Sequence, residues 1–173
     1  LATALSELGC TVDDLSAHLS IDCGDSPTSI AEASFYQEQW RQVLGIEVAV
    51  NSMITKQGSQ NRKTGNYVMS ITGWGPDYND PNTFLDMWVT DGGNNQTGFS
   101  NERYDELIDL AAKETDLEKR ESYFIECEQI IADQLPIGPS FWRAPSYACS
   151  DKIKGGMHRS TFQDINAVYV KLS

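Results

Sequence analysis

The chain is organised around residues 72–81, TGWGPDYNDP, in which a strand-like run ends in glycines, an aromatic residue and carboxylates. Gly73 and Gly75 carry no side chain, so their backbone amides and carbonyls are open to the approach of a second chain. Trp74 between them offers a flat apolar surface, and Asp77 supplies a negative charge. We therefore predict that this segment is a ligand-binding edge. A plain strand-to-helix loop is the alternative, because Gly, Pro, Asn and Asp are common turn residues.

Alternating polar and apolar residues predict three strands, at residues 16–22, 46–50 and 67–72. A helix is expected between the first two, because Ser26 followed by proline is typical of a helix start and Gly45 of a helix end. Strand, helix and strand in this order build a right-handed parallel unit. The expected fold is α/β, a three-layer mixed sheet with helices on both faces. The apolar stripe of the helix between Ser26 and Gly45 is expected to be Ile30, Ala33, Trp40, Val43 and Leu44.

Two amphipathic helices are expected after the central motif. Residues 100–113 place apolar side chains at helical spacing on one face. Thr115 and Glu118 form a capping-box pattern, which predicts the start of a second helix that Pro136 ends. Together these segments predict a helical hairpin. A last strand is expected over residues 166–172, where apolar residues alternate again.

Composition limits the classes of protein to which the chain can belong. With 173 residues, of which 40% are hydrophobic, we expect residues 1–173 to form a single domain. Apolar runs stop well short of the roughly 18 to 20 residues that span a bilayer. A net charge of −12 argues against a nucleic-acid partner, which requires a basic face.

The cysteines and histidines do not form a recognisable metal motif. The four cysteines, Cys10, Cys23, Cys127 and Cys149, are widely separated, and the chain has only two histidines. Because their spacing matches no metal-site pattern, we predict no metal and no cofactor, and interpret the cysteines as small buried apolar residues. The sequence leaves open a disulfide between two of them.

Residues 73–86, GWGPDYNDPNTFLD, resemble the signature of the oligopeptide-binding proteins, extracellular solute-binding receptors that serve ABC importers. The resemblance extends from a helix that ends at Gly9, through residues 40–48, WRQVLGIEV, to residues 166–170, NAVYV. It implies one lobe of a type II periplasmic-binding-protein fold. The chain is similar to the C-terminal lobe of a larger two-lobed receptor, and the N-terminal lobe is missing from it.

The resemblance also implies a set of ligand-binding residues, Arg62, Gly73, Trp74, Gly75, Asp77 and Tyr78. The two glycines would pair through their backbones with an extended peptide, and Trp74 would line a side-chain pocket. Asp77 would hold the α-amino group of the peptide, and Arg62 is expected to meet its carboxylate end. Ile71 stands where some relatives carry arginine, and Gly75 and Pro76 where some carry bulkier residues, which leaves the length and side-chain preferences open.

The implied partners are a peptide, the N-terminal lobe of the same protein and the membrane permease of an ABC transporter. The expected location is extracytoplasmic, either in the periplasm or as a lipoprotein anchored at the outer face of the cell membrane. Receptors for dipeptides, nickel chelates and sugars share the fold, so these solutes remain alternatives. A carboxylate such as Asp77 favours a ligand with a free amine.

Two functions of other classes compete with peptide binding. A carboxylate-based hydrolase such as a glycosidase would use Asp77 and Asp80 as acid and base, but such enzymes place their carboxylates on opposite sides of the substrate. A calcium loop would use oxygens of Asp77, Asn79 and Asp80, but Pro81 and the absence of the EF-hand glycine and distal glutamate break that pattern. We therefore predict a binding protein and no enzyme.

Overall fold

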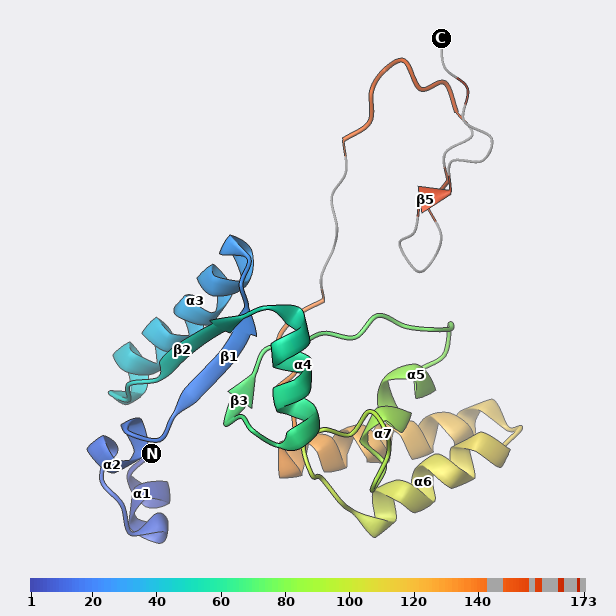
Figure 1. Ribbon diagram of the computed structural model, residues 1–173. Helices are drawn as coiled ribbons and strands as arrows, with labels where there is room; N and C mark the ends of the chain where they lie inside the picture. The colour runs from blue at the N-terminus through green and yellow to red at the C-terminus, as the bar shows by residue number, and fades with distance from the viewer. Residues whose placement is uncertain (143–147, 156–157, 160–164, 167–170, 172–173) are drawn as a thin grey trace. The chain divides into compact units, whose positions relative to one another are not determined.

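A computed structural model of the chain (Figure 1) divides into two compact units, Leu1–Gly73 and Trp74–Ser173. The residues that it describes are 1–142, 148–155, 158–159, 165–166 and 171. A single domain over residues 1–173 stays a prediction.

The first unit contains a parallel sheet of three strands in the order β2-β1-β3. The strands are β1 (Ser20–Gly24), β2 (Ala49–Met53) and β3 (Met69–Ser70). Ile21 of β1 is paired with Val50 on one side and Met69 on the other. The prediction that the three alternating segments share one sheet is therefore confirmed.

The predicted strand boundaries were wrong by several residues. Residues 16–19 do not belong to β1, because the short helix α2 (Val12–Ser16) extends to Ser16 and a turn at residues 17–18 separates it from the strand. Thr11 and Asp14 form a capping box that starts this helix. Ile46 and Val48 are buried although they precede β2, so their alternation reflects burial ahead of the strand. The first helix, α1 (Ala2–Leu8), ends as expected at Gly9, which has a φ of 65°.

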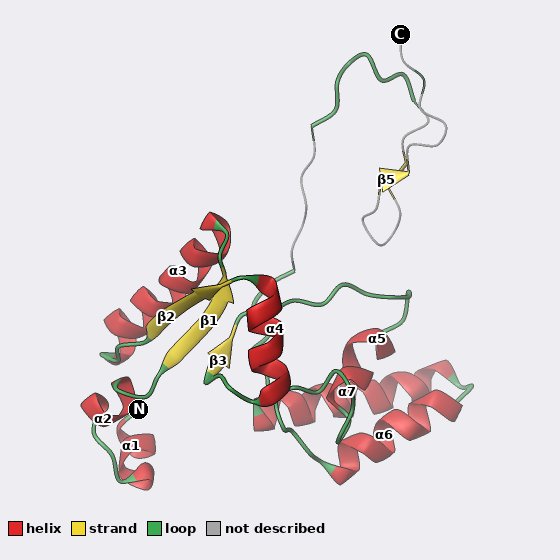
Figure 2. Ribbon diagram, viewed as in Figure 1, coloured by secondary structure: helices red, strands yellow, loops and turns green. Residues whose placement is uncertain are grey.

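Helices cover both faces of this sheet (Figure 2). Helix α3 (Pro27–Leu44) contacts β1 and β2, and α4 (Thr55–Thr64) contacts β1. Successive side chains of a strand point to opposite faces. Ile21 accordingly packs in the core that contains Ala33 of α3, whereas the neighbouring Asp22 accepts a hydrogen bond from Asn61 of α4. The three-layer α/β arrangement is confirmed.

Only part of the predicted stripe of α3 is buried. Ala33 is fully buried and Trp40 packs against the same core, but Ile30, Val43 and Leu44 are exposed. The reason is length, because an 18-residue helix extends about 27 Å, whereas a five-residue strand extends about 17 Å. The ends of α3 therefore project beyond the strands that its middle covers.

The second unit is built on a helical hairpin, as predicted. Its described residues form the helices α5 (Asn82–Leu85), the 3₁₀ helix η1 (Asp86–Trp88), α6 (Glu102–Lys113) and α7 (Leu117–Gln134). The core consists of Leu85, Tyr104, Leu107, Ile108, Ala111, Phe124, Cys127 and Ile131. The predicted capping box was wrong, because Asp116 caps α7 by accepting a hydrogen bond from the Lys119 amide.

Towards the end of the chain, β4 (His158–Arg159) pairs antiparallel with β5 (Ile165–Asn166). The predicted strand over residues 166–172 overlaps β5 at one residue. Its other positions lie outside the described residues except Lys171, which exchanges backbone hydrogen bonds with Lys154 and Gly155. Among the helices that the described residues form, none has the length and apolar character needed to cross a membrane.

Candidate peptide-binding site

The motif begins in irregular backbone after β3, and its glycines leave open space. A Cβ atom built on Gly73 or Gly75 would meet no atom within 4 Å, and neither glycine has a positive φ. The missing side chains therefore serve neither tight packing nor an unusual backbone conformation. They leave the main chain accessible at both positions, as pairing with an extended ligand requires.

Two aromatic residues of the motif are partly exposed. The exposed fractions of Trp74 and Tyr78 are 40% and 42%. The Tyr78 hydroxyl accepts a hydrogen bond from Asn82 Nδ2 at 3.0 Å and lies 3.4 Å from Asp86 Oδ2. The ring of Tyr78 is thus held by the α5 segment while part of it faces solvent, an arrangement that suits contact with a ligand.

Asp77 is fixed by its backbone and leaves its carboxylate accessible. Its amide donates a hydrogen bond of 3.0 Å to the hydroxyl of Thr83, which is buried. Within the described part of the chain, no hydrogen bond or ion pair engages the Asp77 carboxylate. An exposed carboxylate on an anchored backbone can accept charge-assisted hydrogen bonds from an ammonium group.

Asp80 has the opposite environment. Its carboxylate accepts two hydrogen bonds from Arg120 of α7, at 2.6 and 2.9 Å, and a third from the Asn82 amide at 2.9 Å. The hydrogen bonding with Arg120 lowers the pKa of Asp80 from its ordinary value of 3.8, which partial burial opposes. A carboxylate held ionised in this way is poorly suited to donate a proton, so a hydrolase with Asp80 as its acid is disfavoured.

The arrangement of carboxylates also bears on metal binding. Across the described residues, no group of three or more His, Cys, Asp or Glu side chains is placed to hold a metal ion. Asp80, one of the oxygen donors considered for a calcium loop, is occupied by Arg120. The motif therefore offers one accessible carboxylate, Asp77, and not a cage of oxygen ligands.

Arg62 lies in the first unit, on α4, at a cavity of about 200 Å³. Its Nη1 atom is 3.4 Å from Ser70 Oγ of β3. The cavity also contacts Gly24 and Thr72, so it lies at the carboxyl ends of the strands, where ligands of parallel sheets collect. Thr72 directly precedes Gly73, so chain continuity connects this cavity with the start of the motif.

The structure adds residues that the sequence did not indicate. Asp22 is buried on the α4 face of the sheet and accepts hydrogen bonds from Asn51 and Asn61, at 3.2 and 3.3 Å. The sequence signal that could have indicated Asp22 is a charged residue inside a buried strand, because buried polar groups need hydrogen-bond partners. No local pattern pointed to Thr83 or Arg120, which hold Asp77 and Asp80 in the second unit.

The structure thus combines a parallel sheet with helices on both faces and a glycine-rich segment with one accessible carboxylate. Residues 4–96 match the bacterial extracellular solute-binding proteins, family 5 Middle. The match covers more than half of the chain, and the chain belongs to this family.

Curated relatives include peptide-binding proteins. The chain is 32% identical over 163 residues to the oligopeptide-binding protein OppA of Bacillus subtilis, an alignment that covers 90% of this chain and 29% of that protein. It is 31% identical over 176 residues to the dipeptide-binding protein of Lactococcus lactis, covering 98% of this chain and 32% of that protein. The chain thus spans about a third of the length of these relatives.

Solved structures agree with the fold. Listeria monocytogenes OppA bound to peptide matches with a TM-score of 0.83 and 29% identity, over 99% of this chain and 32% of that one. The substrate-binding domain of an oligopeptide ABC transporter from Bacillus anthracis also gives a TM-score of 0.83, with 26% identity over 99% of this chain and 33% of that one. The predicted lobe of a type II periplasmic-binding-protein fold is confirmed.

Proposed function

We propose that this chain forms the C-terminal lobe of an extracytoplasmic peptide receptor that serves an ABC importer. The observation that carries the proposal is the accessible carboxylate of Asp77 on a backbone fixed by Thr83, next to glycines with open main chain. Membership of the solute-binding family and the names of its oligopeptide- and dipeptide-binding relatives support peptide as the ligand. A binding role, and not catalysis, follows from this assignment.

In the proposed mechanism, one set of contacts provides affinity for the peptide and another sets the register in which it binds. Gly73 and Gly75 exchange main-chain hydrogen bonds with an extended peptide, which are indifferent to its side chains. Asp77 binds the α-amino group and so fixes where the peptide begins. Trp74 and Tyr78 provide apolar surface for peptide side chains, in keeping with their partial exposure.

Arg62 has the second charged role in this proposal. Its guanidinium lies at the cavity near the carboxyl ends of the strands, where it would attract a carboxylate of the ligand. A carboxylate that accepts hydrogen bonds from an amine, and a guanidinium that donates them to a carboxylate, would favour zwitterionic peptides over neutral solutes.

The proposal includes the rest of the receptor. The N-terminal lobe of the same protein supplies the opposite wall of the cleft, and the permease of the transporter receives the peptide. The location is the periplasm or, for a lipid-anchored receptor, the outer surface of the cell membrane. The family name, which describes extracellular proteins, supports a site outside the cytoplasm.

The test is calorimetric titration of the full-length receptor with unmodified tri- to pentapeptides, the same peptides N-acetylated, a nickel chelate, a glycoside and calcium. We expect the unmodified peptides to bind and acetylation to weaken them strongly, because it removes the charge that Asp77 recognises. Binding of the chelate or the glycoside in place of peptides would overturn the peptide assignment. Equal affinity for free and acetylated peptides would reject Asp77 as the amine acceptor.

A further inference from the structure

The segment that carries Asp77 is held at two points within the second unit. At the first, the Asp77 amide donates to the buried hydroxyl of Thr83. At the second, the Asp80 carboxylate binds both Arg120 and the Asn82 amide. Because only two residues separate Asp77 from Asp80, the second point restricts where the Asp77 backbone can lie.

Arg120 is itself held by several contacts. Its Nε donates a hydrogen bond of 3.0 Å to the backbone carbonyl of Ala111, and its guanidinium lies 4.6 Å from the centre of the Phe124 ring. The Arg120 and Asp80 side chains are 23% and 27% exposed. A planar guanidinium fixed on three sides presents its paired donors in one orientation, which a flexible lysine cannot do.

The ion pair also has an electrostatic effect on the motif. Two carboxylates three positions apart would both attract a peptide ammonium group. Arg120 neutralises Asp80 and occupies both of its oxygens, so that Asp77 keeps the uncompensated negative charge within residues 73–81. The amino group of an incoming peptide then has one carboxylate to bind, so the peptide binds in one register.

We propose that Arg120 is a positioning residue for the amino terminus of the bound peptide, which it defines through Asp80 without touching the ligand. This inference rests on the proposed peptide-binding function. It predicts that Arg120 affects the discrimination between free and acetylated peptides, and not only the stability of the hairpin.

The test compares Arg120→Met with a matched control, Arg103→Met, in the full-length receptor. Arg103 lies on the same hairpin and also makes a paired contact with a carboxylate, Glu126, at 2.7 and 2.9 Å, but it does not contact the motif. We expect Arg120→Met to weaken binding of a free-amine tetrapeptide about tenfold while changing the affinity of the acetylated peptide little. Arg103→Met should change neither affinity by more than about twofold.

Two further variants separate geometry from charge and remain informative if Arg120→Met folds poorly. Arg120→Lys keeps the charge but loses the paired contact, so its preference for the free amine should fall between wild type and Arg120→Met. Asp80→Asn combined with Arg120→Met removes the competing carboxylate and should restore part of that preference.

The possible results distinguish this inference from the proposed function. If the wild type binds no peptide, the proposed function fails and this inference with it. If the wild type binds peptides without preferring the free amine, Asp77 is not the amine acceptor and this inference fails, while peptide binding stands. If the wild type prefers the free amine and Arg120→Met or Arg120→Lys keeps that preference in full, Arg120 is only structural and the inference alone is overturned. Equal losses for both peptides in Arg120→Met would have the same meaning.

Discussion

Asp77 and Asp80 lie three positions apart and have the same chemistry, yet their neighbours give them different environments. Asp77 exposes its carboxylate and is anchored through its backbone by Thr83. Asp80 is partly buried and bound by Arg120. A role assigned from residue type alone would treat the two alike, as the hydrolase and calcium alternatives did. The environment of each carboxylate determines whether it is available to a ligand.

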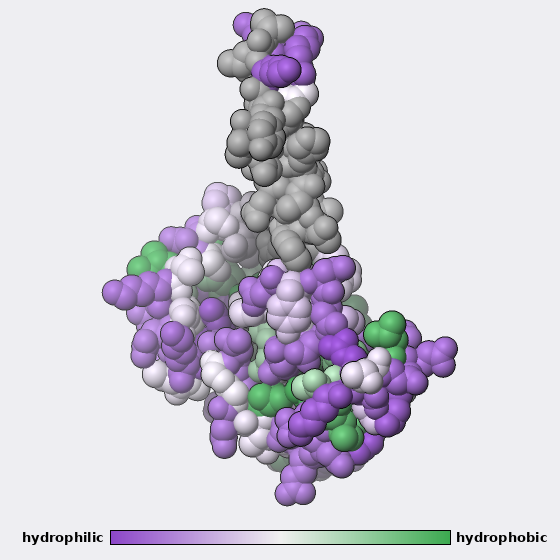
Figure 3. All heavy atoms as spheres, turned by 90° about the vertical axis from the view of Figure 1, so that its right-hand side faces the viewer, coloured by the Kyte–Doolittle hydropathy of each residue, from purple (hydrophilic) through white to green (hydrophobic). Residues whose placement is uncertain are grey.

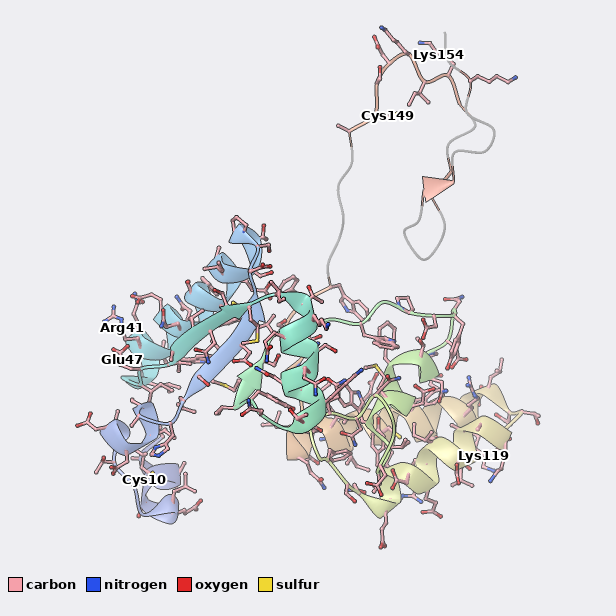
Figure 4. All side chains as sticks on the ribbon, in the orientation of Figure 1. Cys10, Arg41, Glu47, Lys119, Cys149 and Lys154 are labelled. Carbon is pink, nitrogen blue, oxygen red and sulfur yellow. The ribbon has the colours of Figure 1, made fainter. Side chains whose placement is uncertain are left out.

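The four thiols should differ in reactivity because they differ in burial. Cys23 and Cys127 are buried, whereas Cys10 is partly exposed and Cys149 is exposed. Figure 4 labels Cys10 and Cys149. Burial raises the pKa of Cys127 to about 12 and also raises that of Cys23. Since the thiolate is the reactive form, we expect a disulfide reagent to label two thiols quickly and the other two only after denaturation. Rapid labelling of all four in the native chain would contradict the buried positions.

The hydroxyl of Tyr104 should stabilise the second unit. Tyr104 is fully buried and donates a hydrogen bond of 2.6 Å to the backbone carbonyl of Leu85. Tyr104→Phe leaves that carbonyl without its donor, so we expect the free energy of unfolding to fall by about 1–3 kcal/mol in denaturant titration. Tyr36→Phe is the control, because the Tyr36 ring stacks on Trp40 while its hydroxyl has no hydrogen bond with any described residue.

At the level of elements, the helices were predicted more accurately than the strands. Ser26 and Gly45 mark the ends of α3 as expected, because capping groups act within one turn of the residues they serve. The start of β1 was misplaced because the hydrogen bonds of Thr11 with Asp14 begin a helix whose end overlaps the alternating pattern. Alternation of polar and apolar residues does not show at which residue such a helix ends and the strand begins.

Within the candidate site, the sequence indicated the residues of the contiguous motif, whose role stays a prediction, but not the residues that hold them in place. Glycines, an aromatic residue and a carboxylate next to one another carry their own chemical signal. The contact of Asp80 with Arg120 joins residues 40 positions apart. Such a pairing depends on how the hairpin of α6 and α7 packs near α5, which no local pattern specifies.

The ion pair between the motif and α7 should make stability depend on pH in acid. Because the pKa of Asp80 is lowered, its contribution is present above the ordinary pKa of 3.8 and is lost as the pH falls through the lowered value. We expect wild type to be more stable than Asp80→Asn at neutral pH, with the difference narrowing as the solution becomes more acidic. Urea titrations at a series of pH values measure this difference. If the difference in free energy of unfolding between the two proteins stays constant down to the lowest pH measured, the charge of Asp80 does not stabilise the fold.

On the scale of the whole molecule, the chain is acidic and carries its negative charge on a hydrophilic surface. The net charge is −12, and hydrophilic residues cover much of the face shown in Figure 3. A surface of this kind does not attract nucleic acid. Under the proposed function, such a surface would help to attract a peptide ammonium group, since a field of one sign favours ligands of the other.

The chain by itself should bind peptides weakly, because we propose that it supplies one wall of a two-lobed cleft. Hydrogen bonds that face water contribute about 1 kcal/mol each, and exposed ion pairs contribute less. Association costs at least about 4 kcal/mol, which offsets most of that gain. We expect residues 1–173 to fold but to bind tri- to pentapeptides no tighter than about millimolar in calorimetry. Micromolar binding would mean that this lobe carries a complete site.

The central claim is that Asp77 binds the amino terminus of a peptide. A thermodynamic cycle that combines one substitution in the protein with one modification of the peptide tests this claim most directly. Calorimetry on the full-length receptor would compare wild type with Asp77→Asn, each titrated with a tetrapeptide and with its N-acetylated form. We predict that the substitution costs about 2–5 kcal/mol of binding free energy for the free-amine peptide and close to nothing for the acetylated one. An equal loss for both peptides, or no loss for either, would contradict the account.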